Sequence, residues 1–138
     1  MTREEFIKSL CDVFNESFEG VFFRARTAGW LEQEDDLFKD DTITRKNAAR
    51  ILHMYLLKVK ELPDLKDISG AEVLRDLYDC RVCANHVAQM YLRGIMDARP
   101  LDKAGSFLWF DLDGEDDDDS IALYLKRALK TVTNRENH

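Results

Sequence analysis

Apolar residues recur at spacings of three and four near the start of the chain, and this spacing constrains the fold more than any other feature. A repeat of about 3.6 residues places side chains on one face of an α-helix. The pattern predicts an amphipathic helix from Arg3 to about Ala28, with Gly20 as a point of division and Gly29 as its end. The apolar positions are Phe6, Ile7, Leu10, Cys11, Phe14, Phe18, Val21, Phe22 and Ala25.

The same spacing predicts further helices in the rest of the chain. The expected elements are a loop over residues 29–44, a helix from Thr44 to about Val59, a short helix after Gly70, a helix over residues 82–93 that Gly94 ends, and a helix over residues 120–132. Six Gly and two Pro residues are too few for the many turns of an all-β protein. We therefore expect an all-α fold of about five helices.

The chain is long enough for one hydrophobic core and too short for two ordinary domains. Of its 138 residues, 45% are hydrophobic, so residues 1–138 are expected to form a single helical domain. No stretch approaches the ~20 apolar residues of a transmembrane segment. The acids after Met1 are unlike a secretion signal, which predicts a cytoplasmic protein if Met1 is the native start and a cell-surface protein if a signal was removed.

Negative charge is concentrated near the C-terminus. The formal net charge is −7, and residues 111–119 contain seven acids and no base, so the rest of the chain is neutral overall. An acidic chain without a basic stripe repels phosphate groups, which argues against a nucleic-acid partner. The spacing of the acids does not match an EF-hand loop. A solvated acidic loop is therefore favoured over a weak Ca²⁺ site.

The sequence contains an internal repeat. Each unit has a helix that ends in glycine and two apolar residues, an acidic loop with a phenylalanine, and a second helix. The units span about residues 3–60 and about residues 67–132. The corresponding segments are Gly29-Trp30-Leu31 and Gly94-Ile95-Met96 at the helix ends, Phe38 and Phe110 in the loops, and Thr42-Ile43-Thr44-Arg45 and Tyr124-Leu125-Lys126-Arg127 in the second helices.

This order resembles the S-layer homology (SLH) repeat. The segment from Leu37 to Arg45 resembles the loop and the Ile-Thr-Arg-Ala-Glu signature of that family, with Lys46-Asn47 in place of the last two residues. In the second unit, Asp67-Ile68 and the segment from His86 to Ile95 resemble the opening residues and first helix of the repeat, and acids replace its later Ile-Thr-Arg. The resemblance covers most of residues 10–130.

The resemblance implies a bacterial, non-catalytic module that binds anionic, pyruvylated cell-wall polysaccharide, commonly through three repeats around a shared axis. The predicted ligand-binding residues are Thr44, Arg45 and Asn47. A guanidinium beside the free N–H groups of a helix N-terminus is a suitable anion receptor. In the alternative interpretation, Thr44 only caps the helix and Arg45 pairs with Asp40 or Asp41.

Cys80, Cys83 and His86 recur every three residues, which places them within one broad face of a helix. Three cysteines are an odd count, which argues against a disulfide framework, so buried and reduced thiols are favoured. A metal site and a redox site are the alternatives. Structural zinc requires four ligands, and the remaining candidates are isolated in the sequence: Cys11, His53 and His138.

The sequence shows no motif of an enzyme active site. His86 has no accompanying nucleophile signature, and no phosphate-binding glycine loop occurs. We therefore expect a binding protein with no catalytic residue, metal or cofactor. The alternative to polysaccharide binding is an intracellular helical module that binds a protein partner or forms a homo-oligomer.

Overall fold

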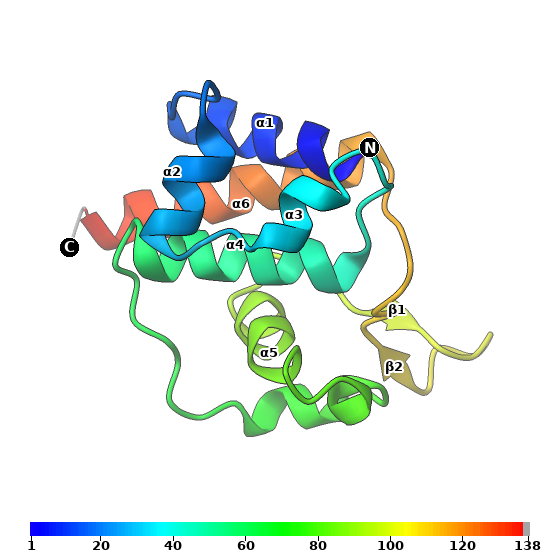
Figure 1. Cartoon of the computed structure of the whole chain (residues 1–138). Helices are drawn as coiled ribbons and strands as arrows, with labels where there is room; N and C mark the ends of the chain where they lie inside the picture. Colours follow the sequence, from blue (N-terminus) through cyan, green and yellow to red (C-terminus); the bar gives the residue numbers. More distant parts are fainter. Residues whose placement is uncertain (137–138) are drawn as a thin grey trace.

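The computed structural model describes residues 1–136, so His138 lies outside the described part of the chain. These residues form six α-helices, two 3₁₀-helices and one two-stranded sheet (Figure 1). The elements are α1 (Arg3–Phe14), α2 (Val21–Ala28), α3 (Gln33–Leu37), α4 (Arg45–Lys58), η1 (Ser69–Val73), η2 (Leu77–Asp79), α5 (Ala84–Leu92), β1 (Arg99–Pro100), β2 (Leu108–Trp109) and α6 (Asp118–Glu136).

Three long helices, α1, α4 and α6, form the centre of the molecule, and α5 packs against α4 (Figure 1). Helix α6 contacts both α1 and α4. Their apolar faces meet in one buried cluster, to which α5 adds Val87 and Met90 and the loops add Trp30, Ile95 and Phe110. Removal of these side chains from water stabilises the fold. Among residues 1–136, no helix is both long and apolar enough to cross a bilayer.

Several helix ends follow local signals in the sequence. Helix α1 begins with a capping box, in which Thr2 Oγ1 accepts from the Glu5 N–H at 3.1 Å and Glu5 Oε1 accepts from the Thr2 N–H at 2.9 Å. Gly29 and Gly94 follow the ends of α2 and α5 with φ of +90° and +71°. A side chain is strained in this left-handed conformation. Both glycine stops confirm the sequence prediction.

The helix expected over residues 3–28 is two helices, and the break begins before Gly20. Helix α1 ends at Phe14, and Asn15 takes the left-handed conformation with φ of +59°. Asparagine tolerates this conformation because its short polar side chain can bond locally. Gly20, with φ of +70°, then directs the chain into α2.

The all-α expectation is corrected by a short hairpin, in which β1 pairs antiparallel with β2. The segment Phe107-Leu108-Trp109-Phe110 supplies the aromatic residues that strands favour. Two further expectations change. The loop over residues 29–44 contains α3, and the short helix expected after Gly70 is the pair η1 and η2.

Candidate functional site

Arg45 is only 2% exposed and is bonded to its own chain. Its Nε donates to the carbonyl of Phe110 at 2.7 Å, and its Nη2 donates to the carbonyl of Asp97. Its Nη1 donates to Asp116 at 2.7 Å and to the Tyr124 hydroxyl at 3.0 Å. All three guanidinium nitrogens of this predicted ligand-binding residue are therefore used inside the protein.

The acidic loop covers the N-terminus of α4. The backbone N–H groups of Arg45 and Lys46 donate to the carbonyls of Gly114 and Leu112, both at 2.9 Å. Thr44 has the extended backbone of an N-cap residue, but its side chain makes no capping bond and its buried hydroxyl has no hydrogen-bond partner among the described residues. Thr44 is therefore the N-cap residue by position, as predicted, but the predicted capping bond of its hydroxyl is wrong, and Thr44 and Arg45 do not present this helix end to solvent.

The alternative pairing of Arg45 with Asp40 or Asp41 is also wrong. Asp41 lies beside the start of α1, where its carbonyl accepts from the Arg3 N–H at 2.9 Å. The carboxylate that reaches Arg45 comes instead from Asp116, 71 positions further along the chain. Tertiary packing, which sequence distance does not reveal, selects this partner.

The acidic loop is more ordered than the solvated run of acids expected from the sequence. The buried carboxylate of Asp76 accepts from the N–H groups of residues 110–112 at 2.7, 2.8 and 3.3 Å. Arg99 pairs with Asp111 at 2.6 Å and with Asp116 at 2.7 Å. Several of the acids therefore hold the loop in place. Within residues 1–136, no three His, Cys, Asp or Glu side chains are grouped as ligands for a metal ion.

A groove of about 530 Å³ lies beside α4, and we call it the α4 groove. Lys46, Asn47 and Arg50 line it from one face of α4, because residues three and four apart share a helix face. Asn47 is thus the one predicted ligand-binding residue that the structure places in a groove. The other lining residues are Arg3, Glu32, Glu34, Phe38, Asp41, Cys80, Val82, Cys83 and His86.

A buried ion cluster supports one side of the α4 groove. Asp35 is fully buried and accepts from Arg3 at 3.0 Å and from Arg50 at 2.6 and 3.0 Å. Glu34, which is about half exposed, lies 3.4 Å from Arg50. Burial disfavours the charged form of Arg50, but hydrogen bonds and attraction to Asp35 outweigh it and raise its pKa. Arg50 is therefore fixed in place as a charged group, and the same carboxylate holds Arg3.

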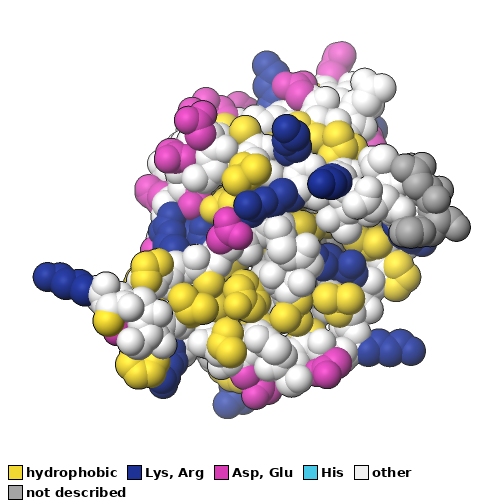
Figure 2. Space-filling model, turned by 180° about the vertical axis from the view of Figure 1, so that it is seen from behind, with side chains coloured by type: hydrophobic (Ala, Val, Ile, Leu, Met, Phe, Trp, Pro, Cys, Tyr) yellow, Lys and Arg dark blue, Asp and Glu magenta, His cyan; other side chains and the backbone are white. Residues whose placement is uncertain are grey.

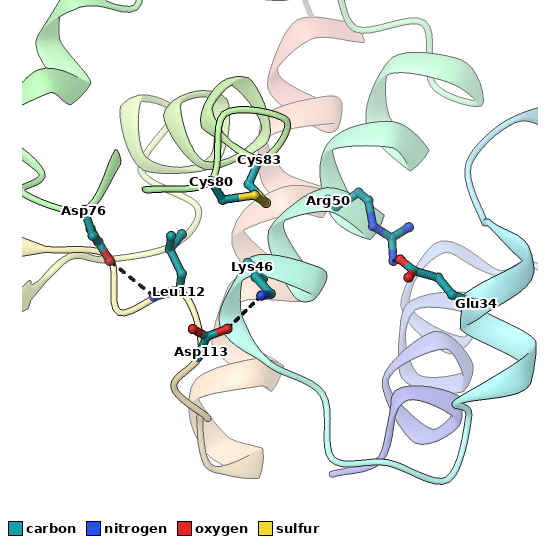
Figure 3. Close-up of a disulfide and its surroundings, with 8 residues drawn as sticks. All are labelled: Glu34, Lys46, Arg50, Asp76, Cys80, Cys83, Leu112 and Asp113. Carbon is teal, nitrogen blue, oxygen red and sulfur yellow. Dashed lines mark hydrogen bonds and ion pairs between the residues drawn. A yellow bond between two sulfur atoms is a disulfide. The ribbon is translucent and has the colours of Figure 1, made fainter. Parts of the chain in front are cut away.

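Lys46 is held more loosely than Arg50. Its Nζ lies 2.7 Å from Asp113, whose side chain is 81% exposed. Such a surface pair contributes about 0–1 kcal/mol, so Lys46 can exchange this partner for a ligand at little cost. Figure 3 shows Lys46 and Arg50 extending from α4 toward opposite sides, with Cys80 and Cys83 nearby.

Cys80 and Cys83 form a disulfide, which corrects the expectation of reduced thiols (Figure 3). The Cys83 N–H donates to the Cys80 carbonyl at 3.1 Å in a tight turn, and this turn brings the two Cα atoms to 5.2 Å, a distance suited to a disulfide. Cys11 is a free thiol in the core, as expected. Burial, with a contribution from Glu16, raises the pKa of Cys11 to about 11.

A histidine pair lies at the edge of the α4 groove, which His86 lines. His53 Nδ1 and His86 Nδ1 are 2.7 Å apart, and His53 Nε2 lies 2.6 Å from Asp64. His53 thus lies between Asp64 and His86, with one ring nitrogen in contact with each. Which ring nitrogen donates in each contact depends on the tautomers of the two rings.

We expect acid to weaken the fold through His86. Burial, and then the charges of His53 and Arg50, lowers the pKa of His86 to about 4. Between about pH 6.5 and this value the unfolded chain binds the proton and the folded protein does not, so stability falls as pH falls, by about 1–2 kcal/mol. Urea unfolding at about pH 7 and about pH 5 measures this loss.

The matched variant is His86→Asn, which retains an N–H donor near the position of Nδ1 and has no charge to gain. Its stability should change less between the two pH values than that of the original protein. An equal loss in both proteins would assign the pH dependence to other groups.

Sequence reasoning missed Arg3 and Arg50 as groove residues, although signals for both are present. Thr2-Arg3 repeats the pair Thr44-Arg45 at the start of another helix, and each arginine is buried against a carboxylate. Arg50 follows Lys46 by four residues, one turn later on the same helix face.

Comparison of this chain with known family models, with curated proteins and with solved structures finds no significant match. A proposal for the function therefore rests on the residues that line the α4 groove.

Proposed function

We propose that this chain is a non-catalytic module that binds an anionic cell-wall polysaccharide in the α4 groove. The observation that carries the proposal is that Lys46, Asn47 and Arg50 all line one groove large enough for a sugar unit. The resemblance of residues 37–45 to the SLH signature supports the same class of ligand.

The groove offers the mixture of contacts that an acidic sugar needs. Lys46 and Asn47 donate hydrogen bonds, and a carboxylate gains charge-assisted bonds from such donors. The carboxylates of Glu32 and Glu34 accept from sugar hydroxyls. Phe38 is 50% exposed, and it gives the apolar face of a sugar ring a surface on which to lie.

The proposal includes the two SLH-like units over about residues 3–60 and 67–132. In support, α2 ends at Gly29 and is followed by α4 after a segment that contains α3, and α5 ends at Gly94 and is followed by α6 after a segment that contains β1 and β2. Helices α4 and α6 contact each other, so each unit buries part of its apolar surface against the other. Arg45 then has a structural role, since it joins α4 to the loop before α6.

We expect Lys46→Gln and Asn47→Ala each to weaken polysaccharide binding about tenfold. Lys46→Gln removes the positive charge of the donor and Asn47→Ala removes a donor altogether, and a hydrogen bond to a charged group contributes about 1.5–3 kcal/mol. The experiment titrates purified acidic wall polysaccharide into the protein by calorimetry, before and after chemical removal of the acidic substituent. Removal of that substituent should abolish the difference between the original protein and Lys46→Gln.

The matched control is Lys8→Gln, which removes the same charge from the exposed face of α1, away from the groove. It should bind as tightly as the original protein. An equal loss of affinity in Lys8→Gln and Lys46→Gln would show that the effect comes from net charge alone. Unchanged affinity in both groove variants would show that the polysaccharide does not bind in the α4 groove.

A second function, binding of a protein partner or of another copy of the chain, is favoured by exposed apolar side chains. Phe23 of α2 is 78% exposed and lines a hollow of about 340 Å³ with Arg26 and Thr27. On the face turned away in Figure 1, hydrophobic side chains are interspersed with Lys and Arg (Figure 2). Absence of polysaccharide binding, together with a concentration-dependent dimer in sedimentation, would favour this function.

A further inference from the structure

The disulfide of Cys80 and Cys83 lies in the wall of the α4 groove rather than in the core. Both cysteines are partly exposed and line the groove. Cys80 and Lys46 also line a second cavity of about 390 Å³. Cys80 is therefore next to two cavities through which a small reagent can approach it.

The surroundings of Cys83 favour a thiolate. Cys83 is the N-cap residue of α5, a helix of nine residues, and no side chain caps this helix end. The first N–H groups of a helix lack partners within the helix and carry partial positive charge. Lys46 and Arg50 also line the groove, but each is paired with a carboxylate, Asp113 for Lys46 and Asp35 for Arg50. Acids line the groove as well: Glu32, Glu34 and Asp41. The helix terminus is therefore the feature that favours the thiolate, because a cysteine at a helix N-terminus has a lowered pKa.

We propose that Cys80 and Cys83 form a thiol–disulfide exchange site that accepts electrons from a dithiol reductant in the α4 groove. This inference does not depend on polysaccharide binding. It rests on the paired cysteines in the groove wall and on the helix terminus behind Cys83.

The exchange balances without any further reactant. A thiolate of the dithiol attacks Cys80 Sγ, a bond forms between these two sulfurs, and the bond between Cys80 and Cys83 breaks with its electron pair on Cys83 Sγ. The second thiol of the reductant loses its proton to water and attacks the mixed disulfide, which releases Cys80 as a thiolate that takes a proton from water. The dithiol is oxidised to a disulfide and the protein disulfide is reduced, with two electrons transferred.

Cys11 provides an internal control for this chemistry. It is fully buried in the core, and its raised pKa keeps it a thiol at neutral pH. A thiol without thiolate character reacts slowly with alkylating reagents. Alkylation of Cys11 therefore reports unfolding, and alkylation of Cys80 and Cys83 without Cys11 reports exchange in the folded protein.

The first experiment treats the folded protein with glutathione buffers and with dithiothreitol, then with iodoacetamide, and locates the labels by mass spectrometry. We expect both reductants to open the disulfide without denaturant, with Cys80 and Cys83 labelled, Cys11 unlabelled and circular dichroism unchanged. Structural disulfides resist reduction by glutathione. A bond that opens only in denaturant, or only together with labelling of Cys11, would overturn the proposal.

The second experiment compares two variants that each retain one thiol of the pair, Cys80→Ser and Cys83→Ser. Thiolate absorbance in the ultraviolet is followed as pH rises. The midpoint for Cys83 in Cys80→Ser should lie about one pH unit or more below that for Cys80 in Cys83→Ser. Equal midpoints would contradict the role of the α5 terminus. If a variant fails to fold, the glutathione experiment on the original protein still decides the proposal.

Discussion

Arg45→Met lowers the free energy of unfolding by about 3–5 kcal/mol, which is the range for removal of one partner from a buried ion pair. Methionine fills a similar volume but removes the guanidinium 2.7 Å from the nearly buried carboxylate of Asp116, which then keeps only Arg99 as a cationic partner. The carbonyls of Phe110 and Asp97 lose their donors in the same change. The loss should appear in urea unfolding followed by far-UV circular dichroism.

Two comparisons isolate the role of the guanidinium of Arg45. Arg45→Lys keeps the positive charge, but its single nitrogen cannot reach all four acceptors at once, so it should still cost about 2 kcal/mol. Arg26→Met removes an exposed arginine from α2 and should change stability by less than about 0.5 kcal/mol. Equal stabilities of Arg45→Met and Arg26→Met would show that the bonds of Arg45 contribute nothing to folding.

Helix positions could be predicted from the sequence because their causes are local. The apolar spacing along α4 and α6 is set by helix geometry, and the ends at Gly29 and Gly94 are set by the conformational freedom of glycine. The break after Phe14 was missed because it depends on Asn15, a residue that also tolerates helical conformations.

Long-range pairing could not be predicted in the same way. Residues before α4 include Asp40 and Asp41, which were the nearest candidate partners for Arg45 in the sequence, whereas the fold brings Asp116 to it from the loop before α6. The resemblance to a known signature directed attention to the start of α4, but the backbone carbonyl of Gly114 occupies that site.

The candidate groove was predicted in part. Asn47 was predicted as a ligand-binding residue and lines the groove, whereas Lys46 and Arg50 were not predicted, although Arg50 lies near Asn47, three residues later on the same helix face. The opposite wall could not be predicted, because Cys80 and His86 reach α4 only through the packing of α5. Spacing of three residues suggested one helix face for the cysteines, but Cys80 lies in the turn before α5, and this turn permits the disulfide.

Asp35→Asn should destabilise the protein by about 3–5 kcal/mol, although the side chain keeps its size. The fully buried carboxylate is the common acceptor of Arg3 and Arg50, and its Oδ2 also accepts from the Glu32 N–H at 2.8 Å. The amide removes the negative charge and leaves two guanidinium groups close together in a site with little water. Repulsion between the two guanidinium groups and incomplete hydrogen bonding then both lower the free energy of unfolding.

Glu34→Gln is the matched control for Asp35→Asn, because it removes one negative charge from the same helix and from the same partner, Arg50. Glu34 is about half exposed and lies 3.4 Å from the guanidinium, so its loss should cost less than about 1 kcal/mol. The two variants are compared by urea unfolding near pH 7, where the carboxylates are ionised. Similar losses in both would mean that burial of Asp35 adds nothing to the pair, and that the ion cluster does not fix α3 against α1 and α4.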